Sequence, residues 1–276
     1  MKVFLNETWS QYWQGRDPFK EARAVQGQVY RNKEGRRTLR FEQERQGFFL
    51  KYHEGVGWKE ILKNFLQFRL PVLGAANEFN ACNALKKLNI DTMTPVAFGE
   101  RGNNPAQQES FLITEELANT VSLEDYCKSW SRVSPSLREK RSIIRKLAQI
   151  SKTLHENGIN HRDYYLCHFL RAENSEPFCV QDALYLIDLH RAQIRQATPQ
   201  RWLIKDLAGL FYSAFDLPLT RHDVLCFLAV YRREWLRGEV KTLREIASKA
   251  VALYQKDFGR DPPTHIQHIL SYWAER

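Results

Sequence analysis

Two aspartates stand where a carboxylate could do chemistry. Asp163 lies in the polar segment His161-Arg162-Asp163, and Asp188 follows about 25 residues later, at the end of the apolar run Leu184-Tyr185-Leu186-Ile187. A hard cation such as Mg²⁺ takes oxygen ligands and usually only one or two carboxylates together with phosphate oxygens, so one aspartate at a strand end is sufficient. The alternatives are that His161-Arg162-Asp163 is a chance run of polar loop residues, and that Asp188 is a turn residue, as is common for aspartate.

The segment from His161 to His168 resembles the catalytic loop of the protein-kinase superfamily, H-R-D-x-x-x-x-N. The resemblance implies that Asp163 orients the attacking hydroxyl and accepts its proton, that Asp188 binds Mg²⁺, and that ATP is the phosphate donor. His161 and Arg162 would support the loop. His168 replaces the usual asparagine, so it is either a second metal ligand or a structural histidine.

A lysine and a glutamate upstream match two further positions of that superfamily in type and order. Lys51 ends the apolar run Phe48-Phe49-Leu50, and Glu78 lies near the start of a later helical pattern. The resemblance implies that Lys51 contacts the ATP phosphates and that Glu78 pairs with it. Either residue alone could be a solvated surface charge. The stretch 31–37, where the superfamily usually has three glycines that cover the phosphates, holds only Gly35.

The residues after Asp188 narrow the class of kinase. Leu189-His190-Arg191 replaces the usual Phe-Gly, no A-P-E follows, and a helical pattern begins soon afterwards near Trp202. This argues against a regulated protein kinase and for a small-molecule or glycolipid kinase. Asp206, in Lys205-Asp206-Leu207, resembles a buried aspartate that braces the catalytic loop in related enzymes, although the helix dipole also explains an aspartate near a helix start.

Taken together, these motifs resemble the lipopolysaccharide core heptose(I) kinases, over roughly residues 20 to 260. The strongest is Asp163-Tyr164-Tyr165-Leu166-Cys167-His168-Phe169, in which His168 is the residue expected for that family. The resemblance implies dependence on ATP and Mg²⁺, and phosphorylation of a hydroxyl on the first heptose of the lipopolysaccharide inner core. It also implies a place at the cytoplasmic face of the inner membrane of a Gram-negative bacterium.

The hydrophobic patterns predict elements that would position these residues. The first part reads as strands over 25–30, 38–41 and 48–52 in an antiparallel meander, a helix over 77–88, and strands over 94–99 and 110–114. The second part reads as helices, with one pair of short strands inside 178–188; the helices cover 123–130, 136–157, 202–215, 221–237, 242–258 and 264–273. We expect an α+β, bilobal, protein-kinase-like fold with a β-rich N-lobe over 1–116 and a helical C-lobe over 117–276.

A basic amphipathic helix is predicted over 58–73, with Trp58, Phe65 and Phe68 among its apolar residues. It could face acyl chains, an anionic membrane or a small acidic protein partner. Packing on its own lobe is the alternative.

The composition of the chain limits the classes of partner that it can attract. A formal charge of +9 attracts an anionic membrane, an acidic partner or nucleic acid, but the basic residues are spread along the chain, so no specific nucleic-acid binding is expected. The odd number of cysteines, five, without a CxxC pair favours reduced thiols.

Two competing hypotheses are a kinase of the same fold with another acceptor, such as Kdo or a protein, and a non-catalytic basic binding module. The combination of Lys51, Asp163 and Asp188 weighs against the latter.

Overall fold

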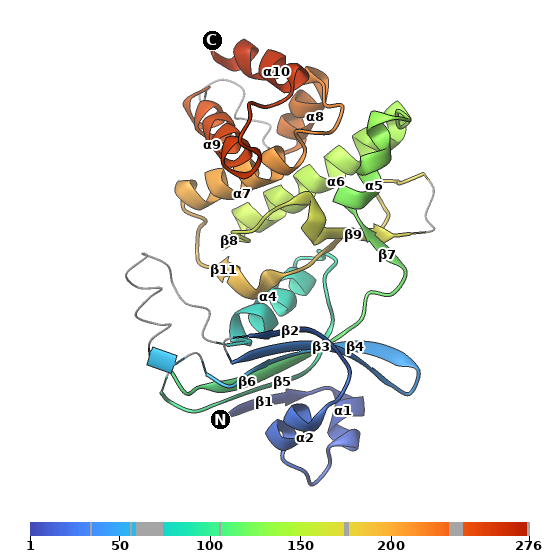
Figure 1. Ribbon diagram of the computed structural model, residues 1–276, viewed down its shortest axis with the longest axis vertical. Helices are drawn as coiled ribbons and strands as arrows, with labels where there is room; N and C mark the ends of the chain where they lie inside the picture. The colour runs from blue at the N-terminus through green and yellow to red at the C-terminus, as the bar shows by residue number, and fades with distance from the viewer. Residues whose placement is uncertain are drawn as a thin grey trace. The chain divides into compact units, whose positions relative to one another are not determined.

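The computed structural model describes residues 1–33, 35–55, 57–58, 74–104, 106–173, 177–231 and 240–274. The chain forms two compact units (Figure 1). The first comprises Met1–Lys87, Thr92–Ala118 and Leu189–Arg191, and the second comprises Leu88–Asp91, Asn119–Asp188 and Ala192–Arg276. The division into lobes at 116/117 stays a prediction of the sequence. Among the described residues, no helix is long and apolar enough to cross a membrane.

The first unit is built on a six-stranded antiparallel sheet in the order β1-β5-β6-β4-β3-β2. Its strands are β1 (Lys2–Leu5), β2 (Gln28–Lys33), β3 (Arg36–Gln43), β4 (Gln46–His53), β5 (Pro95–Arg101) and β6 (Glu109–Glu115). Among the described residues, the helices that pack on it are α1 (Glu7–Tyr12), α2 (Pro18–Ala24) and α4 (Ala76–Lys87). The predicted meander is confirmed as β2-β3-β4, except that 25–27 precede the first of these strands.

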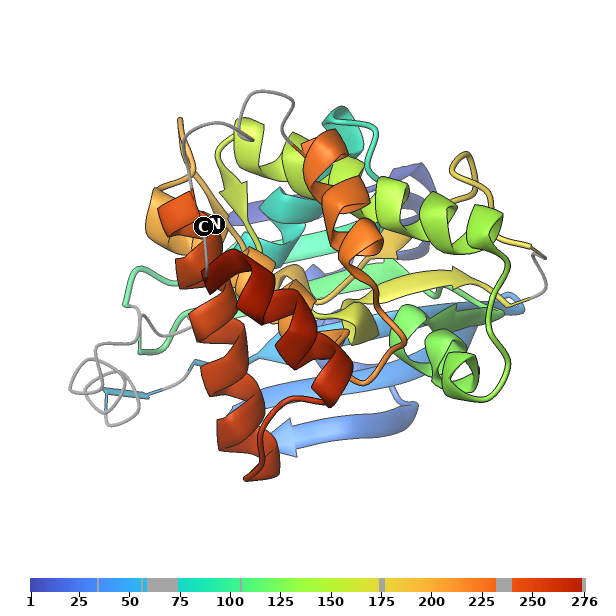
Figure 2. The ribbon, with the colours of Figure 1, turned by 90° about the horizontal axis from the view of Figure 1, so that it is seen from above.

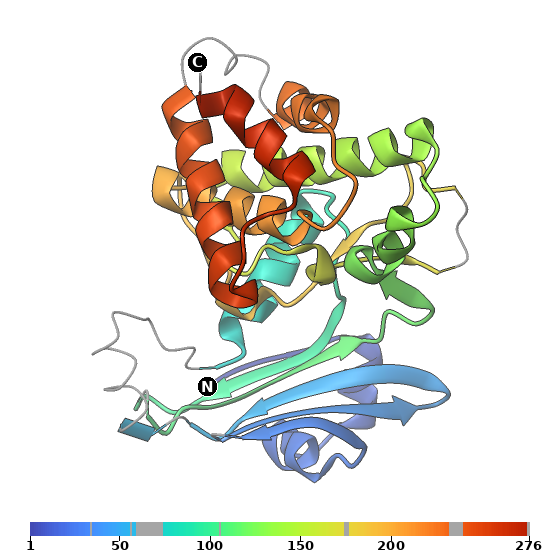
Figure 3. The ribbon, with the colours of Figure 1, turned by 45° about the horizontal axis from the view of Figure 1, so that its top comes forward.

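The two faces of this sheet bury different residues because side chains alternate along a strand. Phe111 packs with Trp9 and Phe19 of α1 and α2 on one face. Its neighbour Leu112 packs with Phe79 of α4 on the other face, as the layers of Figure 3 show. The sheet is therefore covered on both sides, and α4 is held against the side that does not carry α1 and α2.

The second unit is mainly helical, which with the first unit confirms the predicted α+β class. Its helices are α5 (Leu123–Cys127), α6 (Leu137–Glu156), α7 (Gln200–Ser213), α8 (Arg221–Tyr231), α9 (Val240–Phe258) and α10 (Thr264–Ala274). α6 packs against α8, and α7 against α9 (Figure 2). The start of α6 follows from its sequence, because the Ser136 side chain accepts a hydrogen bond from the Glu139 N–H as an N-cap.

Short strands and 3₁₀ helices connect these helices. They are β7 (Thr120–Ser122), η1 (Lys128–Ser131), β8 (Ile159–Asn160), η2 (Leu166–His168), β9 (Phe169–Ala172), β10 (Tyr185–Leu186), η3 (Leu189–Arg191, in the first unit) and β11 (Gln193–Ile194). The prediction of a strand pair inside 178–188 is wrong. β10 pairs instead with β9, so the segment before Asp188 is held by the segment that follows His168.

Candidate active site

Lys51 and Glu78 form a partly buried ion pair in the first unit. Lys51 comes from the central strand β4 and Glu78 from the first turn of α4, and Lys51 Nζ lies 2.6 Å from Glu78 Oε1. The Glu78 side chain is only 2% exposed, and a buried carboxylate of this kind needs a cationic partner. The structure thus brings together the two residues that the sequence places 27 positions apart.

His53 lies two residues beyond Lys51 on β4 and shares its surroundings. Burial, together with the positive charges of Arg36 and Lys51, lowers the pKa of His53 to about 3. Its buried Nδ1 has no hydrogen-bond partner among the described residues. His53 is therefore neutral at physiological pH, and the positive charge beside Glu78 comes from Lys51.

The predicted catalytic loop, residues 161–168 of the second unit, is anchored by Asp206 on α7. Its two carboxylate oxygens accept hydrogen bonds from the backbone N–H groups of His161 (2.6 Å) and Arg162 (2.8 Å). The Asp206 side chain is completely buried, so both bonds are charge-assisted and shielded from water. Arg162 has a positive φ of 78°, so the backbone turns sharply just before Asp163. This is the contact expected of an aspartate that braces the loop.

His161 ties the loop to the strand that precedes Asp188. Its Nε2–H donates to the backbone oxygen of Ile187 at 2.9 Å. Burial lowers the pKa of His161, which keeps the ring neutral. His161 therefore contributes a fixed contact to the loop and carries no charge there.

His168 lies between the two candidate aspartates. Its Nδ1 is 2.6 Å from the backbone oxygen of Asp163, and its Nε2 is 3.6 Å from Asp188 Oδ2. Because a carbonyl oxygen only accepts, Nδ1 carries the proton, and in a neutral ring the lone pair is then on Nε2. The backbone N–H of Ile187 donates to the His168 oxygen at 3.0 Å, which holds the two segments together.

The pair formed by Asp188 and His168 suits a divalent cation in part. Both side chains are accessible, at 33% and 20% exposure, and a carboxylate oxygen is a good ligand for Mg²⁺ whereas an imidazole nitrogen is a poorer one. Over the described ranges, no group of three or more His, Cys, Asp or Glu side chains has the arrangement of a metal site.

Sequence reasoning missed two residues that position the loop. Ser213 Oγ accepts a hydrogen bond from the Leu166 N–H at 3.0 Å, and the ring of Trp202 lies 4.9 Å from the guanidinium carbon of Arg162. Trp202 could have been noticed because it lies four residues before Asp206.

Of the predicted membrane or partner residues, Trp58 is 56% exposed, whereas Phe65 and Phe68 lie outside the described residues.

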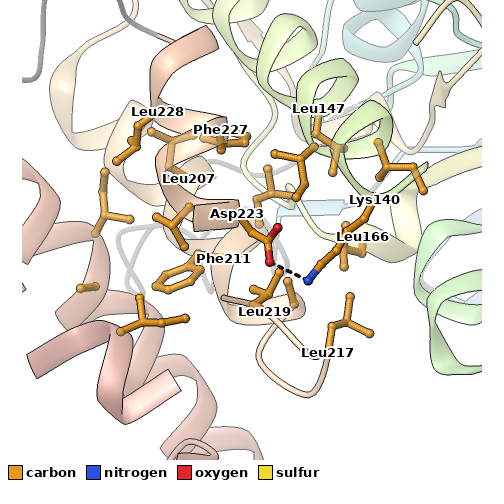
Figure 4. A pocket seen from close by; sticks show the side chains of 18 of the residues that line it. Lys140, Leu147, Leu166, Leu207, Phe211, Leu217, Leu219, Asp223, Phe227 and Leu228 are labelled. Atoms are coloured by element: carbon orange, nitrogen blue, oxygen red, sulfur yellow. Dashed lines mark ion pairs between the residues drawn. The ribbon is translucent and has the colours of Figure 1, made fainter. Parts of the chain in front are cut away.

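A large apolar cavity, of about 150 Å³, lies within the second unit (Figure 4). Leu147 of α6, Leu207 of α7 and Phe227 of α8 are among the many aliphatic and aromatic side chains that line it. Its main polar feature is an ion pair, in which Lys140 Nζ lies 2.6 Å from Asp223 Oδ2. Lys140 also donates to the backbone oxygen of Pro218 at 2.6 Å.

Comparison with known proteins identifies the family. A family model described as the lipopolysaccharide kinase (Kdo/WaaP) family matches residues 20–231. The lipopolysaccharide core heptose(I) kinase WaaP of Pseudomonas aeruginosa is 48% identical over 93% of this chain and 97% of its own length. The protein of the same name from Escherichia coli is 46% identical over 91% and 94%. A solved structure, "WaaP in complex with acyl carrier protein", superposes with a TM-score of 0.81 at 44% identity, covering 92% of this chain and all of that one. The chain therefore belongs to the lipopolysaccharide kinase (Kdo/WaaP) family and is a phosphotransferase.

Proposed function

We propose that this chain transfers the γ-phosphate of ATP to a hydroxyl of the first heptose of the lipopolysaccharide inner core. The names of relatives that match almost their whole length support the reaction and the acceptor. The structural observation that carries the proposal is the position of His168, which contacts the Asp163 backbone and lies beside the Asp188 carboxylate. One side chain thereby links the proposed base to the proposed metal ligand.

In the first unit, Lys51 is the proposed ligand of the ATP phosphates. Its ammonium group is a compact charge with three donors, and one donor direction is used by Glu78. Because Glu78 is buried and fixed on α4, it restricts the lysine to one orientation. The ion pair thus holds the Lys51 ammonium group in position, which lowers the entropic part of the activation free energy of phosphate transfer.

In the second unit, Asp163 is the proposed residue that aligns the sugar hydroxyl and accepts its proton. His161, Arg162 and Asp206 hold its loop through the backbone contacts described above. Asp188, with His168 beside it, would hold Mg²⁺. That ion, when bound, supplies positive charge that stabilises the charge on the transferring phosphoryl group.

The proposed cellular place is the inner membrane of a Gram-negative bacterium, with the protein bound peripherally. The formal charge of +9 supports attraction to the anionic membrane surface, and the acceptor is itself an anionic glycolipid. The organisms of the relatives, P. aeruginosa and E. coli, agree with this setting.

An acyl carrier protein is the proposed small acidic partner. The similar solved structure, a complex of WaaP with acyl carrier protein, supports it, and the apolar cavity of the second unit is suited to an aliphatic chain. Binding of purified acyl carrier protein, with and without an acyl chain, tests this. Ala247→Phe, which narrows the cavity, should weaken the binding of the acylated form, while Ala252→Phe, on the exposed side of α9, should not. Equal binding by both variants would contradict the proposal.

Phosphate transfer to a defined acceptor tests the reaction itself. The assay combines ATP, Mg²⁺ and inner-core lipopolysaccharide that lacks its heptose phosphate, and it locates the new phosphate by mass spectrometry. Asp163→Ala should reduce turnover by about a hundredfold to ten-thousandfold while the protein stays folded. Normal turnover in that variant would contradict the role of Asp163. Transfer to Kdo or to a protein in place of heptose would favour the alternative acceptors.

A further inference from the structure

An open groove with a strongly basic lining runs between α7 and α9 of the second unit. Four cationic side chains and a single carboxylate line it, namely Arg201, Lys241, Arg244, Lys249 and Glu245. All five are exposed to solvent. We call this surface the α7–α9 groove.

The α7–α9 groove carries an excess of positive charge among its described residues. Arg201, Lys241 and Lys249 form no ion pair with any carboxylate in the described part of the chain. Clustered charges of one sign raise the local concentration of ligands of the opposite sign. An ordinary solvated helix surface more often alternates acidic and basic residues at helical spacing.

Trp202 contacts one residue of the groove and one residue of the predicted catalytic loop. Three cations surround the indole ring of Trp202, with their charged atoms 4.9 Å (Arg162), 5.1 Å (Arg201) and 5.6 Å (Lys205) from its centroid. Arg162 directly precedes Asp163, and Arg201 also lines the groove. A cation of the groove and the residue before the proposed catalytic aspartate thus lie against the same indole ring.

The walls of the groove are held in place before any ligand binds. Gln200, at the start of α7, donates from Nε2 to Thr242 Oγ1 at 3.0 Å, near the start of α9. Beneath the groove, Ile204 belongs to the same hydrophobic cluster as Ile246 and Ala250. A surface fixed in this way loses little conformational entropy when a ligand binds.

We propose that the α7–α9 groove, with the cations around Trp202, binds anionic groups of the phosphate acceptor and so orients its sugar toward Asp163. The ligand chemistry is that of carboxylate or phosphate oxygens, which the planar fork of an arginine can bind in a bidentate manner. The inference rests on the proposed function, which supplies an anionic acceptor for the groove to bind. It names Arg201, Lys241 and Lys249 as residues that bind the acceptor without taking part in the chemical step.

Binding of a soluble acceptor separates this inference from the transfer reaction. The probe is deacylated inner-core oligosaccharide, which keeps its carboxylates and phosphates but has no acyl chains, and its dissociation constant is measured by calorimetry at low ionic strength. The triple variant Arg201→Ala/Lys241→Ala/Lys249→Ala should bind it about tenfold more weakly, since each exposed charge pair contributes a modest free energy. Added salt should reduce the difference between variant and wild type.

The matched control removes three exposed arginines from α6, as Arg138→Ala/Arg141→Ala/Arg145→Ala, and should change the dissociation constant less than twofold, a margin of roughly 0.4 kcal/mol. In turnover assays, the groove variant should raise KM for the acceptor and lower kcat, because the groove both binds the acceptor and orients its sugar. It should leave KM for ATP unchanged.

Three outcomes would overturn the inference: no binding of the oligosaccharide by the wild type, equal weakening by the two triple variants, or an unchanged dissociation constant in the groove variant. Binding to phosphatidylglycerol vesicles tests lipid headgroups, which are the other source of phosphate oxygens. A groove variant that loses vesicle binding but keeps oligosaccharide binding would assign the groove to lipid headgroups, against the inference. Oligosaccharide binding without any phosphate transfer would contradict the proposed function and leave the groove assignment in place.

Discussion

Replacing Asp206 with asparagine tests whether the catalytic loop depends on a buried carboxylate. The carboxylate accepts from two backbone N–H groups, at 2.6 Å and 2.8 Å, and is fully buried. An asparagine keeps one carbonyl oxygen, so one bond persists without charge assistance, while its amide group faces the other N–H as a second donor. Losing one charged hydrogen bond and weakening another costs about 2–4 kcal/mol.

This cost is large enough to measure. At 2–4 °C per kcal/mol for a protein of this size class, Asp206→Asn should lower the melting temperature by about 5–15 °C in calorimetry. Because the loop also loses its anchor, kcat should fall by about a hundredfold, the scale expected for a misplacement of about 1 Å. The matched control is Asp261→Asn, an exposed aspartate that accepts only from Gln255 Nε2 at 2.8 Å. Equal melting temperatures and equal kcat for the two variants would refute the reasoning.

Three further predictions concern other charged or titrating residues. Lys140→Ala should lower the free energy of unfolding, measured in urea, by about 3–5 kcal/mol because it leaves the Asp223 carboxylate buried without its cationic partner. The double variant Lys140→Met/Asp223→Leu should recover most of that loss, and no recovery would argue against the importance of the ion pair. His53 has a pKa lowered from 6.5 to about 3, so below pH 6.5 the unfolded chain binds a proton that the folded chain does not. Stability should therefore be lost as pH falls, by about 2 kcal/mol between pH 6.5 and pH 5, and His53→Gln should flatten this dependence; an unchanged slope in the variant would exclude His53 as the cause. Glu78→Gln should raise KM for ATP about tenfold because Lys51 loses its charged partner, and an unchanged KM would remove Glu78 from the proposed site.

Local patterns allowed much of the fold to be predicted. The helix predicted over 136–157 is α6, because Ser136 supplies the N-cap and apolar residues recur at helical spacing up to Leu154. The strand over 48–52 is the centre of β4. The short elements β1, α1 and α2 escaped prediction, since they depend on the burial of Trp9 and Phe19 against the sheet and have little periodicity of their own.

Pairing between strands that are far apart in the sequence set a second limit to what could be predicted. Phe178 and Leu184 are buried and apolar, which suggested two strands, but the partner of β10 is β9, on the other side of a connection that no local signal specifies. In the candidate site, too, the sequence identifies residues but not the contacts between their side chains. Lys51, Glu78, Asp163 and Asp188 stand out by type and order, whereas the contacts of His168 with the two aspartates depend on side-chain orientation and became visible only in the structure.

Asp188 has a backbone φ of 61°, a conformation that costs little for glycine and more for residues with a side chain. Such strain costs on the order of 1 kcal/mol. Selection for heat resistance alone would thus favour Asp188→Gly, and selection for turnover would reject the same change. Position 188 should therefore be enriched in opposite directions in a mutant library sorted in parallel by the two criteria, as expected where a proposed metal ligand is held at the expense of stability.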